Sequence, residues 1–145
     1  MTDGELLRRA AGMGLPIGVV DRRVPILLHG PVGAEILQQE AGLTDISIYK
    51  AVYWHTTANP DLDELGKVVF IADKLDPAKI DSYPYLPQIR QMAFQDLDRA
   101  ILHFLTRQAM DRLNRGELVH PVMVETRNAL LAASGVPANP TGAVE

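Results

Sequence analysis

The chain has 145 residues and a formal net charge of -4 at pH 7, with no cysteine and 47% hydrophobic residues. This length suits one domain with a sizeable core, and the acidic balance argues against binding nucleic acid through its phosphates. The lack of cysteine excludes disulfides, thiolate metal sites and a thiol nucleophile, and it fits a reducing, cytoplasmic compartment. No apolar run reaches the roughly 18 residues of a membrane span, so we expect no membrane partner.

The first predicted helix lies at the N-terminus. Thr2 and Glu5 have the spacing of a capping box, in which each side chain bonds the backbone N–H of the other residue. A short helix should follow and stop near Gly12 or Gly14. Residues 14–24 are predicted to form a loop.

The next two predicted helices are separated by Gly42. One covers about residues 25–40, and Pro31 in its first two turns predicts that the regular helix begins only there. The other is capped by Thr44 and extends to about Trp54, because its apolar residues recur closer to helical than to strand spacing.

A second capping-box spacing, formed by Asp61 and Glu64, predicts another helix start. The run over residues 65–75 is almost entirely apolar and is predicted to be a buried helix. Prolines within residues 77–87 then predict a long loop.

The C-terminal half is predicted to hold two further helices. Residues 87–115 form a long amphipathic stretch that Gly116 closes, and residues 121–133 form a last helix that begins at a proline. The tail over residues 136–145 is rich in Pro, Gly and Ala, and we expect it to be disordered. The predicted fold class is therefore all-α, with one domain over residues 1–135.

The residues best suited to chemistry are two histidines and one aspartate. His29 and His55 lie at the ends or breaks of predicted helices, and Asp73 is an acid within an apolar helix. A buried carboxylate is costly unless it is paired or binds a cation, so these three residues predict a transition-metal site. Taken singly, each has an alternative, since the histidines can be helix-end residues and Asp73 can form an ion pair with a Lys or Arg.

The remaining histidines and cations favour plainer roles. His103 lies in an apolar run and is expected in the core or an interface, and His120, before a proline, is expected to cap a helix. Some cations could meet a phosphate, although each could equally be a solvated surface charge. These cations are Lys67, Lys74, Lys79 and Arg90.

Five segments, in order, resemble the YqeK family of HD-domain proteins over roughly residues 4–133. The segments are Leu27–Ala34, Tyr53–Thr57, Ile71–Pro77, Ile89–Arg90 with Asp96–Ala100, and His120–Pro121 with Glu125–Asn128. Any one of these motifs is weak, but five in the same order are fairly specific. The resemblance implies an HD-domain-like helical bundle.

The resemblance also implies an activity, namely symmetrical bis(5'-nucleosyl)-tetraphosphatase, which cuts diadenosine tetraphosphate into two ADP at a di-iron centre. It carries over His29, His55 and Asp73 as metal ligands. The residues that it implies for the nucleotide substrate are Thr56, Thr57, Lys74 and Arg90. If part of the helical bundle is missing, an apolar face is left uncovered, and a homodimer could hide it.

The chain departs from the family in three places, and over residues 76–81 it keeps a cation, Lys79, but not the family's guanidinium. No histidine precedes His29 and no His-Asp dipeptide occurs in the 145 residues, although family members carry both. A glycine and an arginine of the family are Ala58 and Asn59 here. We therefore expect an N-terminally truncated HD domain that holds metal weakly and has little activity.

Two other functions remain open from the sequence. The chain could be a non-catalytic helical module for nucleotide binding or dimerisation, which the missing His-Asp pair favours and the retained Asp73 opposes. It could also be an HD-type hydrolase of another nucleotide, since Ala58 and Asn59 alter the segment after the threonines.

Overall fold

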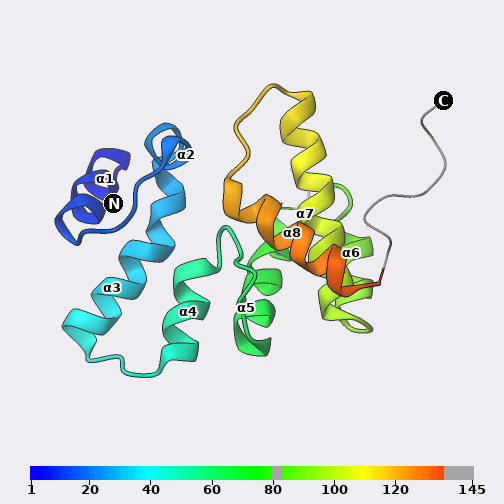
Figure 1. The fold of residues 1–145 in the computed structure, drawn as a ribbon, viewed down its shortest axis with the longest axis horizontal. Coiled ribbons are helices and arrows are strands. Elements are labelled where there is room, and N and C mark those ends of the chain that lie inside the picture. The colour runs from blue at the N-terminus through cyan, green and yellow to red at the C-terminus, as the bar shows by residue number, and fades with distance from the viewer. Residues whose placement is uncertain (80–82, 136–145) are drawn as a thin grey trace.

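The computed structural model describes residues 1–79 and 83–135, and within these ranges it is entirely helical, as predicted. Figure 1 shows the path of the chain. The elements of the described part are α1 (Asp3–Gly12), α2 (Val19–Arg23), the 3₁₀ helix η1 (Pro25–Leu28), α3 (His29–Ala41), α4 (Ile46–Trp54), α5 (Glu64–Lys74), the 3₁₀ helix η2 (Pro77–Lys79), α6 (Leu86–Ala93), α7 (Leu97–Asn114) and α8 (Pro121–Ala133).

The helices pack largely in chain order. α3 packs on α4, α4 on α5, and α5 on α7, while α7 also contacts α6 and α8. α1 lies against η1 and α3, so α1–α3 form one end of the molecule and α6–α8 the other (Figure 1). None of the helices in the described ranges is long and apolar enough to cross a membrane.

The buried apolar residues form two clusters. The larger one surrounds Phe70 and Phe104, whose rings meet edge to face with their centroids 5.9 Å apart, and it joins α5 to α8. The smaller cluster contains Leu6, Leu28 and Val32 from α1, η1 and α3. Burying one such side chain stabilises the fold by about 1.5–3 kcal/mol. Because α3 belongs to the smaller cluster and α4 leads into the larger one, the α3–α4 contact joins the two.

Several predicted elements are confirmed. Both hydrogen bonds of the first capping box are present, since Thr2 N–H donates to Glu5 at 2.7 Å and Glu5 N–H donates to Thr2 at 3.3 Å. The run over residues 65–75 lies almost wholly in α5, and the last helix has the predicted bounds. The prediction that this run is buried is wrong for Leu65 and Val68, which are 44% and 50% exposed. The predicted tail, residues 136–145, lies outside the described residues.

The prediction of a loop over residues 14–24 is wrong. This segment contains α2, a five-residue helix whose start is fixed by Asp21, which accepts a hydrogen bond from Gly18 N–H at 2.8 Å. The regular helix α3 also begins earlier than predicted, at His29 instead of Pro31, because a proline within the first turn of a helix needs no N–H partner.

Two predicted caps lie one or two residues from the true ones. Asp45, not Thr44, caps α4, with its carboxylate accepting from two backbone N–H groups at 2.9 and 3.0 Å. Asp63, not Asp61, caps α5 by accepting from a backbone N–H at 2.9 Å. In both cases several capping residues stand close together, and the one directly before the first helical residue is used.

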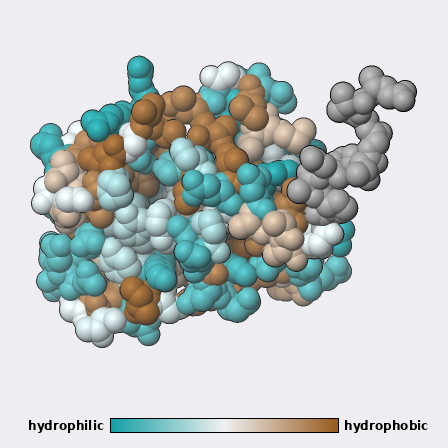
Figure 2. Space-filling view, in the orientation of Figure 1, coloured by the Kyte–Doolittle hydropathy of each residue, from teal (hydrophilic) through white to brown (hydrophobic). Residues whose placement is uncertain are grey.

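The amphipathic stretch over residues 87–115 is two helices and not one. α6 ends at Ala93, and Asp96 begins α7 by accepting a hydrogen bond from a first-turn N–H at 2.9 Å. Phe94 lies in the break with 84% of its surface exposed. Figure 2 shows other apolar side chains gathered on the upper part of one face, over α2 and the turn between α7 and α8.

Candidate metal centre

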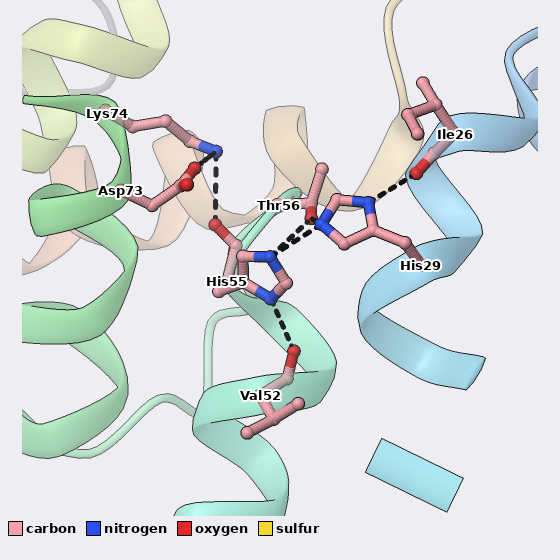
Figure 3. A network of polar contacts seen from close by, with 7 residues as sticks. All are labelled: Ile26, His29, Val52, His55, Thr56, Asp73 and Lys74. Carbon is pink, nitrogen blue, oxygen red and sulfur yellow. Dashed lines mark hydrogen bonds and ion pairs between the residues drawn. The ribbon is translucent and has the colours of Figure 1, made fainter. Parts of the chain in front are cut away.

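Two histidines from neighbouring helices face each other. His29 is the first residue of α3, and His55 is the residue that ends α4. Their Nε2 atoms lie 2.7 Å apart, and the ring planes meet at 69° with centroids 4.7 Å apart (Figure 3). The structure therefore brings together two residues that are 26 positions apart in the chain.

Each imidazole is oriented by a backbone carbonyl three residues before it. Nδ1 of His29 lies 2.5 Å from the carbonyl oxygen of Ile26, and Nδ1 of His55 lies 2.6 Å from that of Val52. A carbonyl oxygen can only accept a hydrogen bond, so both Nδ1 atoms must carry the proton. In the neutral rings both Nε2 atoms are then lone-pair acceptors.

Two acceptor nitrogens at this distance repel each other unless a proton or a cation lies between them. Metal-bound imidazole nitrogens lie at about 2.0–2.1 Å from the ion, so two of them at right angles are about 2.9 Å apart. The observed 2.7 Å between the Nε2 atoms of His29 and His55 is close to this value. Metal-binding histidines also donate the other ring N–H to a carbonyl or carboxylate, as both rings do here.

The surroundings of His55 favour its neutral form, which is the form that can bind a metal. Burial lowers the pKa of His55 below its usual 6.5, although the hydrogen bond to the Val52 carbonyl acts in the opposite direction. The nearby His29 lowers the pKa further. These surroundings hold the ring of His55 toward its neutral form, in which Nε2 has a lone pair for a metal.

Gly30 allows the close approach of the two helices. A Cβ atom at this position would lie 2.7 Å from the carbonyl oxygen of Tyr53 and 3.3 Å from the ring of His55. Only a residue without a side chain fits there. Gly30 directly follows His29 in the chain, so it explains why a glycine stands beside that histidine.

Asp73, the third predicted ligand, lies beside the pair with its carboxylate bound to a lysine. Its Oδ2 is 2.9 Å from Nζ of Lys74, which also donates to the His55 carbonyl oxygen at 3.1 Å (Figure 3). Lys74 itself is buried, with Nζ 4.9 Å from the centre of the Phe70 ring. Among residues 1–79 and 83–135, no three acidic or histidine side chains meet closely enough to hold an ion. The role of Asp73 as a ligand stays a prediction.

The residues predicted to contact substrate do not all lie at the imidazole pair. The hydroxyl of Thr56 lies 3.3 Å from Nε2 of both imidazoles, at the centre of the site. Thr57 is buried, and its hydroxyl donates to the Ala58 carbonyl at 3.4 Å. Arg90 is exposed on α6 and lines a separate cavity with Asp76. These contacts leave the substrate roles of Thr57 and Arg90 as predictions.

A cavity of ≈ 300 Å³ begins beside the imidazole pair. It is bordered by Thr56 and Lys74 on the side of the pair, and elsewhere by Tyr83, Gln108 and Arg112, among other residues. Tyr83, Gln108 and Arg112 were not predicted from the sequence. Gln108 carries a signal that could have been used, because it is a polar residue in the buried stripe of α7.

His120 borders the same cavity and is a cap, as predicted. Its Nδ1 accepts a hydrogen bond from Val122 N–H at 3.3 Å at the start of α8. Its Nε2 lies 3.4 Å from a carboxylate oxygen of Asp21. This contact ties α2 to α8 along one edge of the cavity.

Comparisons with known proteins find relatives of this chain. The HD domain model matches residues 8–78. The symmetrical bis(5'-nucleosyl)-tetraphosphatase of Bacillus subtilis is 31% identical over 120 residues, which are 83% of this chain and 63% of that protein. The protein of the same name from Halalkalibacterium halodurans is 32% identical over 105 residues, or 72% of this chain and 55% of that protein.

A solved structure is also similar. A protein from Clostridium acetobutylicum, described as a predicted HD superfamily hydrolase involved in NAD metabolism, superposes with a TM-score of 0.83 at 26% identity, over 92% of this chain and 69% of that chain. The chain thus spans between half and two thirds of the length of the curated relatives named above. This chain is an HD-domain protein that resembles the symmetrical bis(5'-nucleosyl)-tetraphosphatases at about 30% identity.

Proposed function

We propose that the chain carries the metal-binding half of a phosphohydrolase site that acts on dinucleoside polyphosphates, with diadenosine tetraphosphate cut to two ADP. The observation that carries this proposal is the imidazole pair, whose Nε2 atoms lie 2.7 Å apart with both Nδ1 atoms bound to carbonyls. The relatives from Bacillus subtilis and Halalkalibacterium halodurans, both symmetrical bis(5'-nucleosyl)-tetraphosphatases, suggest the substrate class.

The roles of the residues follow from their positions. His29 and His55 would hold a divalent transition metal, with iron and a second ion expected from the family resemblance. When bound, such a metal supplies a water nucleophile at neutral pH and neutralises charge on phosphate oxygens. The Thr56 hydroxyl, 3.3 Å from both Nε2 atoms, can donate a hydrogen bond to a phosphate oxygen. The Lys74 ammonium borders the same cavity and adds positive charge to it.

A second candidate is a nucleotide-binding module without turnover. It is favoured by the absence, within the described residues, of a third side chain that completes the ion site with the two imidazoles. The ion pair between Asp73 and Lys74 points the same way, because it occupies the carboxylate expected to bind metal. In this case the cavity would bind nucleotide while the chemistry is weak or lost.

Metal analysis and hydrolysis assays separate the two candidates. The protein is loaded with ferrous iron, dialysed, and tested for bound metal and for ADP release from diadenosine tetraphosphate. Two equivalents of metal with rapid ADP release would establish the hydrolase and overturn our expectation of low activity. Nucleotide binding without ADP release would establish the binding module, and a panel of other nucleotides would reveal a different substrate.

A matched pair of histidine variants tests whether the imidazole pair binds the metal. His55→Gln should abolish metal retention, whereas His103→Gln, on the half-buried side of α7, should leave it unchanged. Equal metal retention by both variants would remove the imidazole pair from the proposal.

The homodimer and the cytoplasmic location stay predictions. Sedimentation of the purified chain tests the homodimer.

A further inference from the structure

We propose that Gln108 determines base specificity, with its side-chain amide binding the amino edge of an adenine seated in the cavity beside the imidazole pair. This inference rests on the proposed function, because it takes a nucleotide as the ligand. It adds a base-recognition role that the metal site does not explain.

Gln108 is a buried amide without a complete set of partners. It lies on the inward face of α7, four residues after Phe104, and only 7% of its surface is exposed. Its Oε1 is buried and accepts no hydrogen bond from any described residue. A buried acceptor left unpaired destabilises a protein, so such groups in native structures call for an explanation.

The rest of the cavity suits a nucleoside. Tyr83 and Met123 border it together with Gln108, and they supply an aromatic face and a thioether. Thr56 and Lys74 border it next to the imidazole pair and supply a hydroxyl and an ammonium group. An apolar, aromatic lining suits a base, and a cation with a hydroxyl suits phosphate, so one nucleotide could span both parts.

The chemistry of the amide matches adenine. A glutamine amide offers an acceptor oxygen beside a donor nitrogen, and adenine offers an amino donor beside a ring-nitrogen acceptor. The unpaired Oε1 would then accept a hydrogen bond from the adenine amino group.

The test is a set of binding measurements on the full chain by isothermal titration calorimetry. Gln108→Leu, which keeps the size but removes the amide, should weaken ADP binding about tenfold or more, as expected for the loss of a bidentate base contact. It should leave the affinity for inorganic pyrophosphate, which has no base, unchanged. Gln38→Leu, an exposed glutamine of α3, should change neither affinity.

A second measurement keeps the test valid if Gln108→Leu does not fold. Purine riboside diphosphate lacks the amino group, so wild type should bind it about tenfold more weakly than ADP. Equal affinities for the two, or equal losses of ADP and pyrophosphate binding in the variant, would overturn the inference. Failure of the wild type to release ADP from diadenosine tetraphosphate, with the ADP preference retained, would instead sink only the proposed hydrolase activity.

Discussion

Replacing Gly30 by alanine tests whether the imidazole pair depends on the close contact between α3 and α4. The added Cβ would lie 2.7 Å from the carbonyl oxygen of Tyr53 and 3.1 Å from that of Val52. Both are backbone atoms, so no side-chain rotation can relieve the clash. Since carbon and oxygen approach comfortably only to about 3.3–3.6 Å, the two helices must separate by roughly half an ångström or more.

The expected change in the free energy of unfolding of Gly30→Ala follows from two opposing effects. Overpacking of this kind costs about 1–3 kcal/mol, and alanine gains up to about 1 kcal/mol over glycine within a helix. Gly30→Ala should therefore destabilise the fold by about 1–2 kcal/mol. Gly33→Ala is the matched control, because its Cβ would lie 4.0 Å from the Val52 side chain and only the helix-forming gain applies. It should stabilise the fold by up to about 1 kcal/mol.

Urea unfolding and metal titration give the two results. Gly30→Ala should lower the urea midpoint and weaken metal binding about tenfold or more, since it displaces the two ligands from each other. Gly33→Ala should raise the midpoint and leave metal binding unchanged. If Gly30→Ala were as stable as wild type, or less damaging than Gly33→Ala, the argument from close packing would be refuted.

Three further outcomes are expected. Asp63→Ala should lower the melting temperature more than Asp61→Ala, because only Asp63 caps α5, and equal losses would contradict this. The Ser47 hydroxyl, and then the first-turn N–H, hold the pKa of Asp63 below its usual 3.8. The ionised carboxylate therefore stabilises the fold above the unfolded pKa, and this stabilisation is lost as pH falls through the folded pKa. The difference in stability between wild type and Asp63→Asn should accordingly narrow in acid denaturation below about pH 4. Ala58, at φ 61°, should tolerate glycine within about 1 kcal/mol, because relief of the left-handed strain offsets the lost methyl group, whereas Ala10→Gly within α1 should cost about 2 kcal/mol in urea unfolding.

The sequence predicted helices well where a repeating apolar face and a terminal signal agree. The capping box at Thr2 and the proline and glycine around residues 121–133 mark helix ends by local chemistry, so neither needs tertiary information. The stretch over residues 87–115 misled because its apolar residues stay in phase across the break at residues 94–96. Asp96 is a capping residue there, but the same residue type is also tolerated within a helix on its exposed face.

In the candidate site, too, the features set by local chemistry could be predicted and those that depend on tertiary contacts could not. His29 and His55 could be singled out because they lie at helix ends, where a side chain is free to turn toward a neighbouring element. The direction of the Asp73 carboxylate could not be predicted, since it depends on the adjacent Lys74 and on the carbonyl that this lysine reaches. Gln108 was missed because the candidate residues were sought among histidines, acids and cations.

The geometry of the imidazole pair arises from two separate levels of structure. Each ring donates to a carbonyl three residues before it in the chain, at Ile26 in η1 or Val52 in α4, so its orientation is set locally. The distance between the rings is set by the approach of α3 to α4, which the missing side chain of Gly30 permits. Because both Nδ1 atoms are committed to carbonyls, neither neutral ring can donate to the other, and the contact stabilises the protein only when a positive species joins the two nitrogens. A histidine pair selected merely for folding would place one donor opposite one acceptor, so the arrangement seen here favours a binding role.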